Sequence, residues 1–193
     1  MKIQHTVFLK LPEVDDAGEE GMAAVVRKFR GMTGLECGFD RFFTVYGGYS
    51  HCLLVVAESA EALRDYLHSE FHLKDWMAAV KPYLRGILVF DSEMKEDLGP
   101  VVSISLLAVD PSETRPPQGA LPHLGSVFLK EVKWPDKTNG FTHCLNVSFQ
   151  DRRDLLSYLI SDDRSEIVDP VAHHPEGTCL VTCNTDFGQL FKA

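Results

Sequence analysis

The feature that most constrains this chain is an internal repeat. Residues 49–53 and 141–145 both read aromatic, hydroxyl, His, Cys, Leu, and they lie 92 positions apart. Tyr66 recurs as Tyr158 at the same offset. A repeated pattern at a fixed offset is the sequence signature of repeated structural units. We therefore predict that the 193 residues hold two copies of one small module.

The two copies divide at a short linker. Residues 95–100 read Lys-Glu-Asp-Leu-Gly-Pro, which is typical of a turn-rich connection. We assign the first copy to residues 1–95 and a degenerate second copy to residues 100–193. The opening strands match at an offset of 98, so the second copy has lost about six residues before its third strand. A stretch with four prolines, 111–122, takes the place of its opening helix.

Each copy is expected to follow the order β-α-β-β-α-β. In the first copy, hydrophobic periodicity and helix caps predict four strands and two helices, the second of them broken at Ser69: strands 3–11, 37–45, 49–57 and 87–91, and a first helix at 15–32. The first strand reads as half-buried, with Phe8 as the exception on its outer face.

That element order is the ferredoxin-like pattern, in which one four-stranded sheet carries helices on one face only. The other face must also be covered, and the sheet of the second copy can cover it. The predicted fold class is therefore α+β, a ferredoxin-like dimeric α/β-barrel whose two tandem copies form an intramolecular pseudo-dimer.

Several polar residues interrupt the apolar pattern of the first copy. His5, His51 and Asp91 lie on apolar strand faces, and Tyr66 and His72 flank the predicted helix break. A buried carboxylate beside an imidazole fixes the imidazole tautomer and stabilises its protonated form. Such a pair can remove a proton next to a carbonyl, and a tyrosine hydroxyl can bond the oxygen that gains charge.

Structural roles compete with these chemical ones. A histidine on an apolar face is usually a satisfied core residue, and His51 has a counterpart in the second copy, which suggests a bond to a helix or strand end. His68 and His72 have the i, i+4 spacing of metal ligands, but no glutamate completes a zincin motif. We predict no metal and no cofactor, since the sequence also lacks a glycine-rich phosphate loop.

Composition limits the classes of binding partner and the cellular location that we expect. The formal net charge is −9, and an acidic surface repels nucleic-acid phosphate and anionic lipid. Five cysteines without a C-x-x-C pair argue against a disulfide framework. The N-terminus has too few apolar residues for a signal peptide or a membrane span. We expect a soluble, cytoplasmic protein, a monomer or homodimer of chains, with a hydrophobic small molecule as its possible partner.

The first copy resembles the stress-responsive A/B barrel family, known as Dabb. The matching segments are 4–10, 48–51, 65–72 and 89–91, and the resemblance is weaker over residues 101–187. A plant polyketide cyclase of this family closes a ring by intramolecular aldol condensation without cofactor or metal. The resemblance implies His72 as catalytic base, Tyr66 beside it, Asp91 as the acid that bonds the base, and His5 in the same pocket.

Two departures from the family accompany this resemblance. Ser69 and Glu70 stand where the family has His-Pro, and no tyrosine of the first helix matches the cyclase. In the second copy, aligned by its two offsets, Arg164, Cys183 and Ser103 replace His72, Asp91 and His5. Only the first copy therefore keeps the polar set.

Three functions fit these observations. The first is a cofactor-free acid–base catalyst with a pocket walled by five further residues of the first copy: His51, Leu9, Leu53, Phe29 and Trp76. The second is a non-catalytic, stress-responsive protein that binds a hydrophobic small molecule. The third is a haem or quinol monooxygenase of similar shape, which no residue specifically supports.

Overall fold

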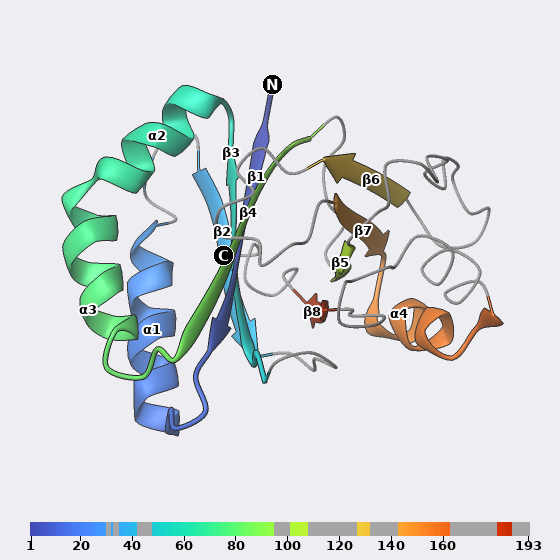
Figure 1. Ribbon diagram of the computed structural model, residues 1–193, viewed down its shortest axis with the longest axis horizontal. Coiled ribbons are helices and arrows are strands. Elements are labelled where there is room, and N and C mark those ends of the chain that lie inside the picture. The colour runs from blue at the N-terminus through green and yellow to red at the C-terminus, as the bar shows by residue number, and fades with distance from the viewer. Residues whose placement is uncertain are drawn as a thin grey trace.

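The computed structural model contains two four-stranded antiparallel sheets stacked face to face (Figure 1). The structure describes residues 1–29, 32, 35–41, 48–94, 101–107, 127–131, 143–162 and 181–186. Among these, no helix is both long enough and apolar enough to span a bilayer. Figure 1 shows the layers in order: the helices of the first half, the first sheet, the second sheet, and the helix of residues 152–159 on its far side.

The first sheet has the strand order β2-β3-β1-β4. Its elements are β1 (Ile3–Lys10), α1 (Asp16–Phe29), β2 (Leu35–Arg41), β3 (His51–Ala57), α2 (Ala60–His68), the π-helix η1 (Phe71–Trp76), α3 (Met77–Val80) and β4 (Gly86–Glu93). The order β-α-β-β-α-β with a broken second helix confirms the prediction and defines a ferredoxin-like α+β fold.

The second sheet has the equivalent order, β6-β7-β5-β8. Its elements are β5 (Val101–Leu107), β6 (Val127–Glu131), β7 (His143–Phe149), α4 (Arg152–Leu159) and β8 (Val181–Asp186). The predicted linker at 95–100 and the proline-rich stretch at 111–122 lie outside the described residues.

The ladder registers relate the two sheets. His5 pairs with Val55 across β1 and β3, while Ser103 pairs with Val147 across β5 and β7. His5 and Ser103 are 98 positions apart, and Val55 and Val147 are 92 apart, as in the sequence alignment. The closing strands differ by one residue from our alignment, because Asn184, not Cys183, pairs with Ser103. The residue that occupies the position of Asp91 in the second sheet is therefore Asn184.

The face of the first sheet that points away from its helices is buried. Phe8 is fully buried and its ring packs edge-on against Phe90 at 6.3 Å between centroids. Gln4 and Thr6 on the same face are buried as well. The expectation of a half-buried first strand with an outward Phe8 is therefore wrong, because the second sheet covers this face.

The two sheets are joined both at their centre and at their edges. The side-chain amides of Gln4 and Asn146 bond each other across the gap, with Asn146 Nδ2 donating to Gln4 Oε1 at 2.8 Å. Strand β2 contacts β8, and β4 contacts β6. Each edge strand of one sheet therefore meets an edge strand of the other, which protects edges that would otherwise pair with other chains.

Helix α1 packs its apolar stripe on the first sheet. Met22, Val26 and Phe29 recur at helical spacing and are all buried. The carboxylate of Asp15 accepts the backbone N–H of Gly18 at 2.8 Å and caps the first turn.

The second helical segment begins and breaks at serines. Ser59 caps α2 by accepting the N–H of Ala62 at 3.1 Å. Ser69 is extended, with ψ of 148°, and its hydroxyl accepts the N–H of His72 at 3.1 Å while donating to the carbonyl of Tyr66 at 2.6 Å. The predicted break at Ser69 is confirmed, because one serine ends α2 and caps the helix that follows.

Candidate functional site

A buried imidazole–carboxylate pair lies on the helix-facing side of the first sheet. His5 and Asp91 are register partners on the neighbouring strands β1 and β4, so their side chains project from the same face. His5 Nδ1 and Asp91 Oδ1 are 2.6 Å apart, and each side chain is only 4% exposed. The Nδ1–H therefore donates to the carboxylate, and in neutral His5 the lone pair lies on Nε2.

This geometry corrects the expected pairing of Asp91 with His72. The Nδ1 of His72 instead donates to the backbone carbonyl of Leu67 at 3.1 Å. Adjacent strands place His5 directly beside Asp91, whereas His72 belongs to the helical layer above the sheet. The residue that bonds the carboxylate is thus His5.

The four predicted catalytic residues nevertheless lie in one row. The His5 and Tyr66 rings meet edge-to-face at 6.2 Å between centroids, and Tyr66 meets His72 in the same way at 4.9 Å. The break at Ser69 makes the second contact possible, because six residues of continuous helix would place Tyr66 and His72 on different sides.

The hydroxyl of Tyr66 is buried and has no hydrogen-bond partner among the described residues. Burial raises the pKa of Tyr66 far above its ordinary value, and the neighbouring Cys37 raises it further. Tyr66 is therefore a neutral phenol at any physiological pH, able to donate a hydrogen bond but not to act as a base.

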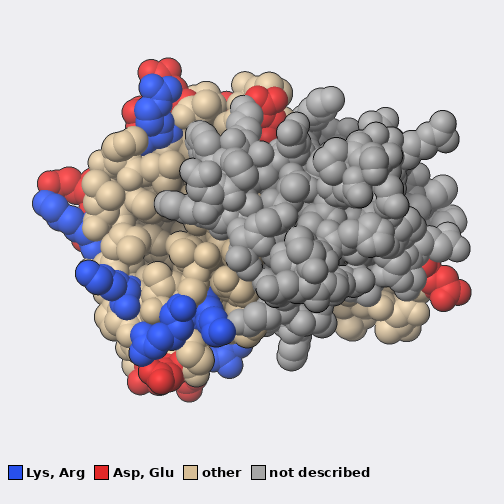
Figure 2. Space-filling view, viewed as in Figure 1, with Lys and Arg blue, Asp and Glu red and all other residues tan. Residues whose placement is uncertain are grey.

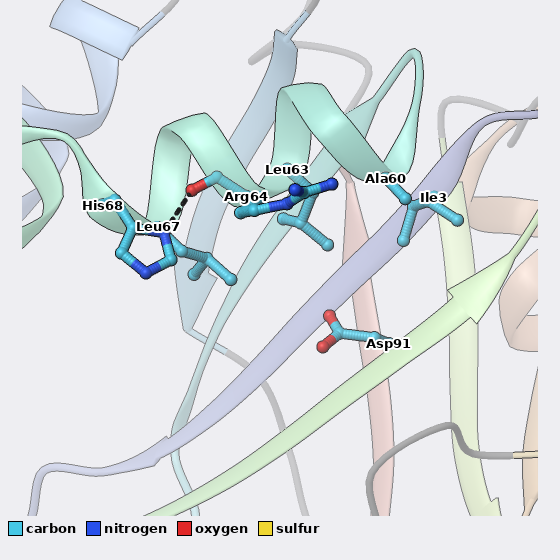
Figure 3. Close-up of a pocket in the computed structure, with 7 residues that line it drawn as sticks. All are labelled: Ile3, Ala60, Leu63, Arg64, Leu67, His68 and Asp91. Carbon is cyan, nitrogen blue, oxygen red and sulfur yellow. Dashed lines mark hydrogen bonds between the residues drawn. The ribbon is translucent and has the colours of Figure 1, made fainter.

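A cavity of about 330 Å³ opens between α2 and the first sheet (Figure 3). Seven residues line it: Ile3, Ala60, Leu63, Arg64, Leu67, His68 and Asp91. In Figure 3 the Asp91 carboxylate points from β4 toward α2, whose residues form the opposite wall. Of the four predicted catalytic residues, Asp91 is the one that lines this cavity, and His5, Tyr66 and His72 lie behind it in the row just described.

The residues of α2 that line the cavity were not predicted as site residues. Ala60, Leu63, Arg64, Leu67 and His68 have the spacing i, i+3, i+4, i+7 and i+8, which defines one helical face. The sequence contained a signal for these residues. The helical face combines two leucines with Arg64 and His68, whereas a face buried in the core would be apolar throughout.

The five predicted wall residues do not line this cavity. Leu9, Leu53, Phe29 and Trp76 are buried members of the main hydrophobic core between helices and sheet. They therefore shape the scaffold beneath the site.

His51 is also buried, but it ties β3 to α1. Its Nε2 lies 3.0 Å from Glu19 Oε1, its Nδ1 lies 2.8 Å from the hydroxyl of Ser50, and its ring stacks on Phe39. These bonds agree with the structural interpretation of this histidine.

The described residues contain no group of three or more His, Cys, Asp or Glu side chains placed to hold a metal ion. The Nδ1 of His68 donates to the carbonyl of Arg64 at 2.8 Å, so it is engaged within its own helix. Figure 2 shows acidic and basic side chains next to one another around the edge of the described part of the first half, with uncharged residues in its middle.

Comparison with known proteins gives one family match. A sequence model of the family described as Stress responsive A/B Barrel Domain, or Dabb, matches residues 3–94. No curated protein is similar enough in sequence to match the chain.

Solved structures with the same fold cover nearly the whole chain. An anthrone oxidase-like protein superposes with a TM-score of 0.60 at 13% identity, covering 95% of this chain and 90% of its own. A protein from Fusobacterium nucleatum described as a putative monooxygenase has a TM-score of 0.59 at 11% identity, covering 95% and 92%. These likenesses show the fold over both sheets.

A third structure corresponds to half of the chain. A Dabb family protein with a ferredoxin-like fold from Mesorhizobium loti is 16% identical, with a TM-score of 0.43, and covers 49% of this chain and 98% of its own.

Proposed function

Because residues 3–94 are a stress responsive A/B barrel domain, we propose that they bind a small, largely apolar molecule in the α2 cavity and transfer a proton on it. Residues 100–193 then act as a degenerate second copy whose sheet covers the first. The observation that carries the proposal is one buried carboxylate, Asp91, on the wall of an otherwise mostly apolar cavity and bonded to a buried histidine.

The pair is suited to general acid–base catalysis. Asp91 faces the ligand, and His5 behind it can hold or release a proton as the carboxylate changes charge. A buried carboxylate without such a partner would be costly, because burial disfavours the charged form. Ile3, Leu63 and Leu67 give the cavity an apolar wall beside the reacting group.

The reaction we propose is a polyketide cyclase-like aldol closure. Asp91 takes a proton from a methylene carbon between two carbonyls, and that carbon attacks a further carbonyl of the same molecule. The alkoxide oxygen then takes the proton back from the Asp91 carboxyl group. The net change is an isomerisation, so the step needs no external oxidant, reductant or metal.

Tyr66 and His72 act as positioning residues in this proposal. The Tyr66 ring packs against His5, and His72 packs against Tyr66, so both restrict the orientation of the imidazole. This assigns to Asp91 and His5 the role that the sequence suggested for His72.

The test uses a linear poly-β-keto thioester and follows the ring product by chromatography and mass spectrometry. We expect Asp91→Asn to slow cyclisation about 100-fold or more, since general bases contribute about 10²–10⁴ in rate. The variant keeps the shape of the side chain and a hydrogen bond to His5. His72→Gln, the comparison variant, should lower the rate by much less.

Non-catalytic ligand binding is the second candidate, favoured by the fact that Asp91 alone of the four catalytic candidates lines the cavity. A wild-type protein that binds the compound without converting it would establish this candidate instead. An Asp91→Asn variant that cyclises at the wild-type rate would reject the acid–base proposal.

A further inference from the structure

We propose that the ligand of the α2 cavity is an amphipathic anion: a small apolar molecule with one carboxylate, held by Arg64 and His68 at the α2 side of the cavity. This inference deepens the proposed function and rests on it, because it assumes that the cavity binds a ligand. It is carried by the two polar side chains that α2 adds to an otherwise apolar wall.

Arg64 has no ion-pair partner in the part of the chain that the structure describes. Some basic side chains of the same half are paired, for example Lys74 with Glu70 at 2.7 Å and Arg85 with Glu13 at 2.8 Å. An arginine that borders a cavity without a carboxylate of its own can bind one in a bidentate manner.

His68 also indicates a ligand with a carboxylate. Its Nδ1 donates to the Arg64 carbonyl, so the ring is oriented by its own helix and Nε2 remains for another partner. Figure 3 shows both side chains on α2, on the opposite side of the cavity from Asp91. A ligand therefore meets basic groups on one side and the His5–Asp91 pair on the other.

The cavity also limits the ligand's size and shape. A volume of about 330 Å³ lies at the lower end of the range for small-molecule sites, about 300–1,000 Å³. Leu63 and Leu67 line the space, and the polar groups of Arg64, His68 and Asp91 border it. The complementary molecule has a short apolar body, a carboxylate, and a hydrogen-bonding group that reaches Asp91.

The second half shows that the fold does not require these polar residues. Helix α4 aligns with α2 at the offset of 92, with Leu155 and Tyr158 buried at the positions of Leu63 and Tyr66. At the positions of Arg64 and His68 it carries Leu156 and Ile160, which are 62% and 88% exposed. Arg64 and His68 are exposed as well, so the position is open to solvent in both halves and the fold does not require a basic residue there.

The decisive experiment compares octanoate with 1-octanol, which share a chain and differ in charge. Binding to the full chain is followed by titration calorimetry and by NMR shifts of α2 residues. We expect octanoate to bind more tightly than octanol, and Arg64→Gln to weaken octanoate by about three- to tenfold, as for one charged hydrogen-bonded contact. The octanol affinity should stay unchanged.

Arg153→Gln, on the exposed surface of α4, is the matched control and should change neither affinity. Equal binding of the acid and the alcohol, or an equal loss of both in Arg64→Gln, would overturn the anion inference and leave cavity binding intact. Failure of both probes to bind at millimolar concentration would overturn the inference together with the ligand-binding part of the proposed function.

Discussion

His5 and His51 lie on the same face of the first sheet and each bonds a carboxylate, but Asp91 lines the cavity and Glu19 does not. His5 contacts a carboxylate on the neighbouring strand that borders a cavity, and His51 contacts Glu19 on α1 and Ser50 beside it. Both are buried, and burial of an imidazole requires a partner for its N–H. Burial alone therefore does not distinguish a histidine with a catalytic role from one that only stabilises the fold. The cavity beside Asp91 makes this distinction for His5.

At this scale Tyr66 gives a prediction about stability. Its hydroxyl is buried without a hydrogen-bond partner among the described residues, which costs free energy. We expect Tyr66→Phe to leave the free energy of unfolding unchanged or to raise it by up to about 1 kcal/mol. Chemical denaturation at neutral pH measures the difference, and a loss of several kcal/mol would show that the hydroxyl has a bonding partner.

The same residue predicts a pH dependence. Burial raises the pKa of Tyr66 in the folded protein, while an unfolded tyrosine loses its proton near pH 10. Above about pH 10 the unfolded state therefore binds fewer protons than the folded state, and stability falls by up to about 1.4 kcal/mol per pH unit. Tyr66→Phe should flatten this alkaline decline in urea midpoints, whereas Tyr83→Phe, a partly buried control, should not.

At the scale of elements, the break between α2 and η1 is the feature that arranges the site. Ser69 bonds both the carbonyl of Tyr66 and the N–H of His72, and so fixes the turn that brings the two rings to 4.9 Å. An uninterrupted helix would have given a straight apolar stripe in place of this contact.

We expect Ser69→Ala to lower the free energy of unfolding by about 1 kcal/mol, the usual effect of losing a helix cap. The His72 ring resonances should also shift, because the backbone that holds the ring is released. Ser59→Ala, which removes the cap of α2 alone, should have a similar stability cost without moving those resonances. Unchanged His72 signals in Ser69→Ala would mean that packing, not the cap, sets the ring contact.

At the scale of the whole molecule, the two sheets pack face to face, and a reciprocal pair of side-chain amides links them. Gln4 bonds Asn146 in both directions, at 2.8 and 3.4 Å, and also donates to Thr6 at 2.9 Å. Such a reciprocal pair favours one alignment of the sheets, because any other alignment breaks both amide bonds across the gap.

A double-mutant cycle tests this link. Asn146→Leu should lower the free energy of unfolding by about 1–3 kcal/mol, since it leaves the Gln4 amide buried without its partner. Adding Gln4→Leu should restore part of the loss, so that the two effects are not additive. As a control, the effects of Gln4→Leu and of Ser157→Ala, on the exposed side of α4, on the free energy of unfolding should be additive. Additive effects of Asn146→Leu and Gln4→Leu would show that the sheets align without the amides.

Much of this architecture could be predicted from the residues alone. Strand and helix periods are local, so the element order, the caps at Ser59 and Ser69 and the helix break followed from the sequence. The offsets of 98 and 92 appear again in the registers of the two sheets. His5, His51 and Asp91 were also recognisable, because each is a polar residue on a strand face whose other residues, two positions apart, are apolar.

Their partners could not be predicted in this way. Asp91 bonds a residue 86 positions away because β4 lies beside β1, and strand order and register are set by the packing of the whole sheet. The cavity exists because α2 packs on β1 and β3 and leaves space beside Asp91 of β4. The sequence determined the element order and the polar residues on the helix-facing side of the first sheet. The tertiary structure decided which of those residues meet and that the opposite face is buried, since both depend on contacts between distant segments that local periodicity does not encode.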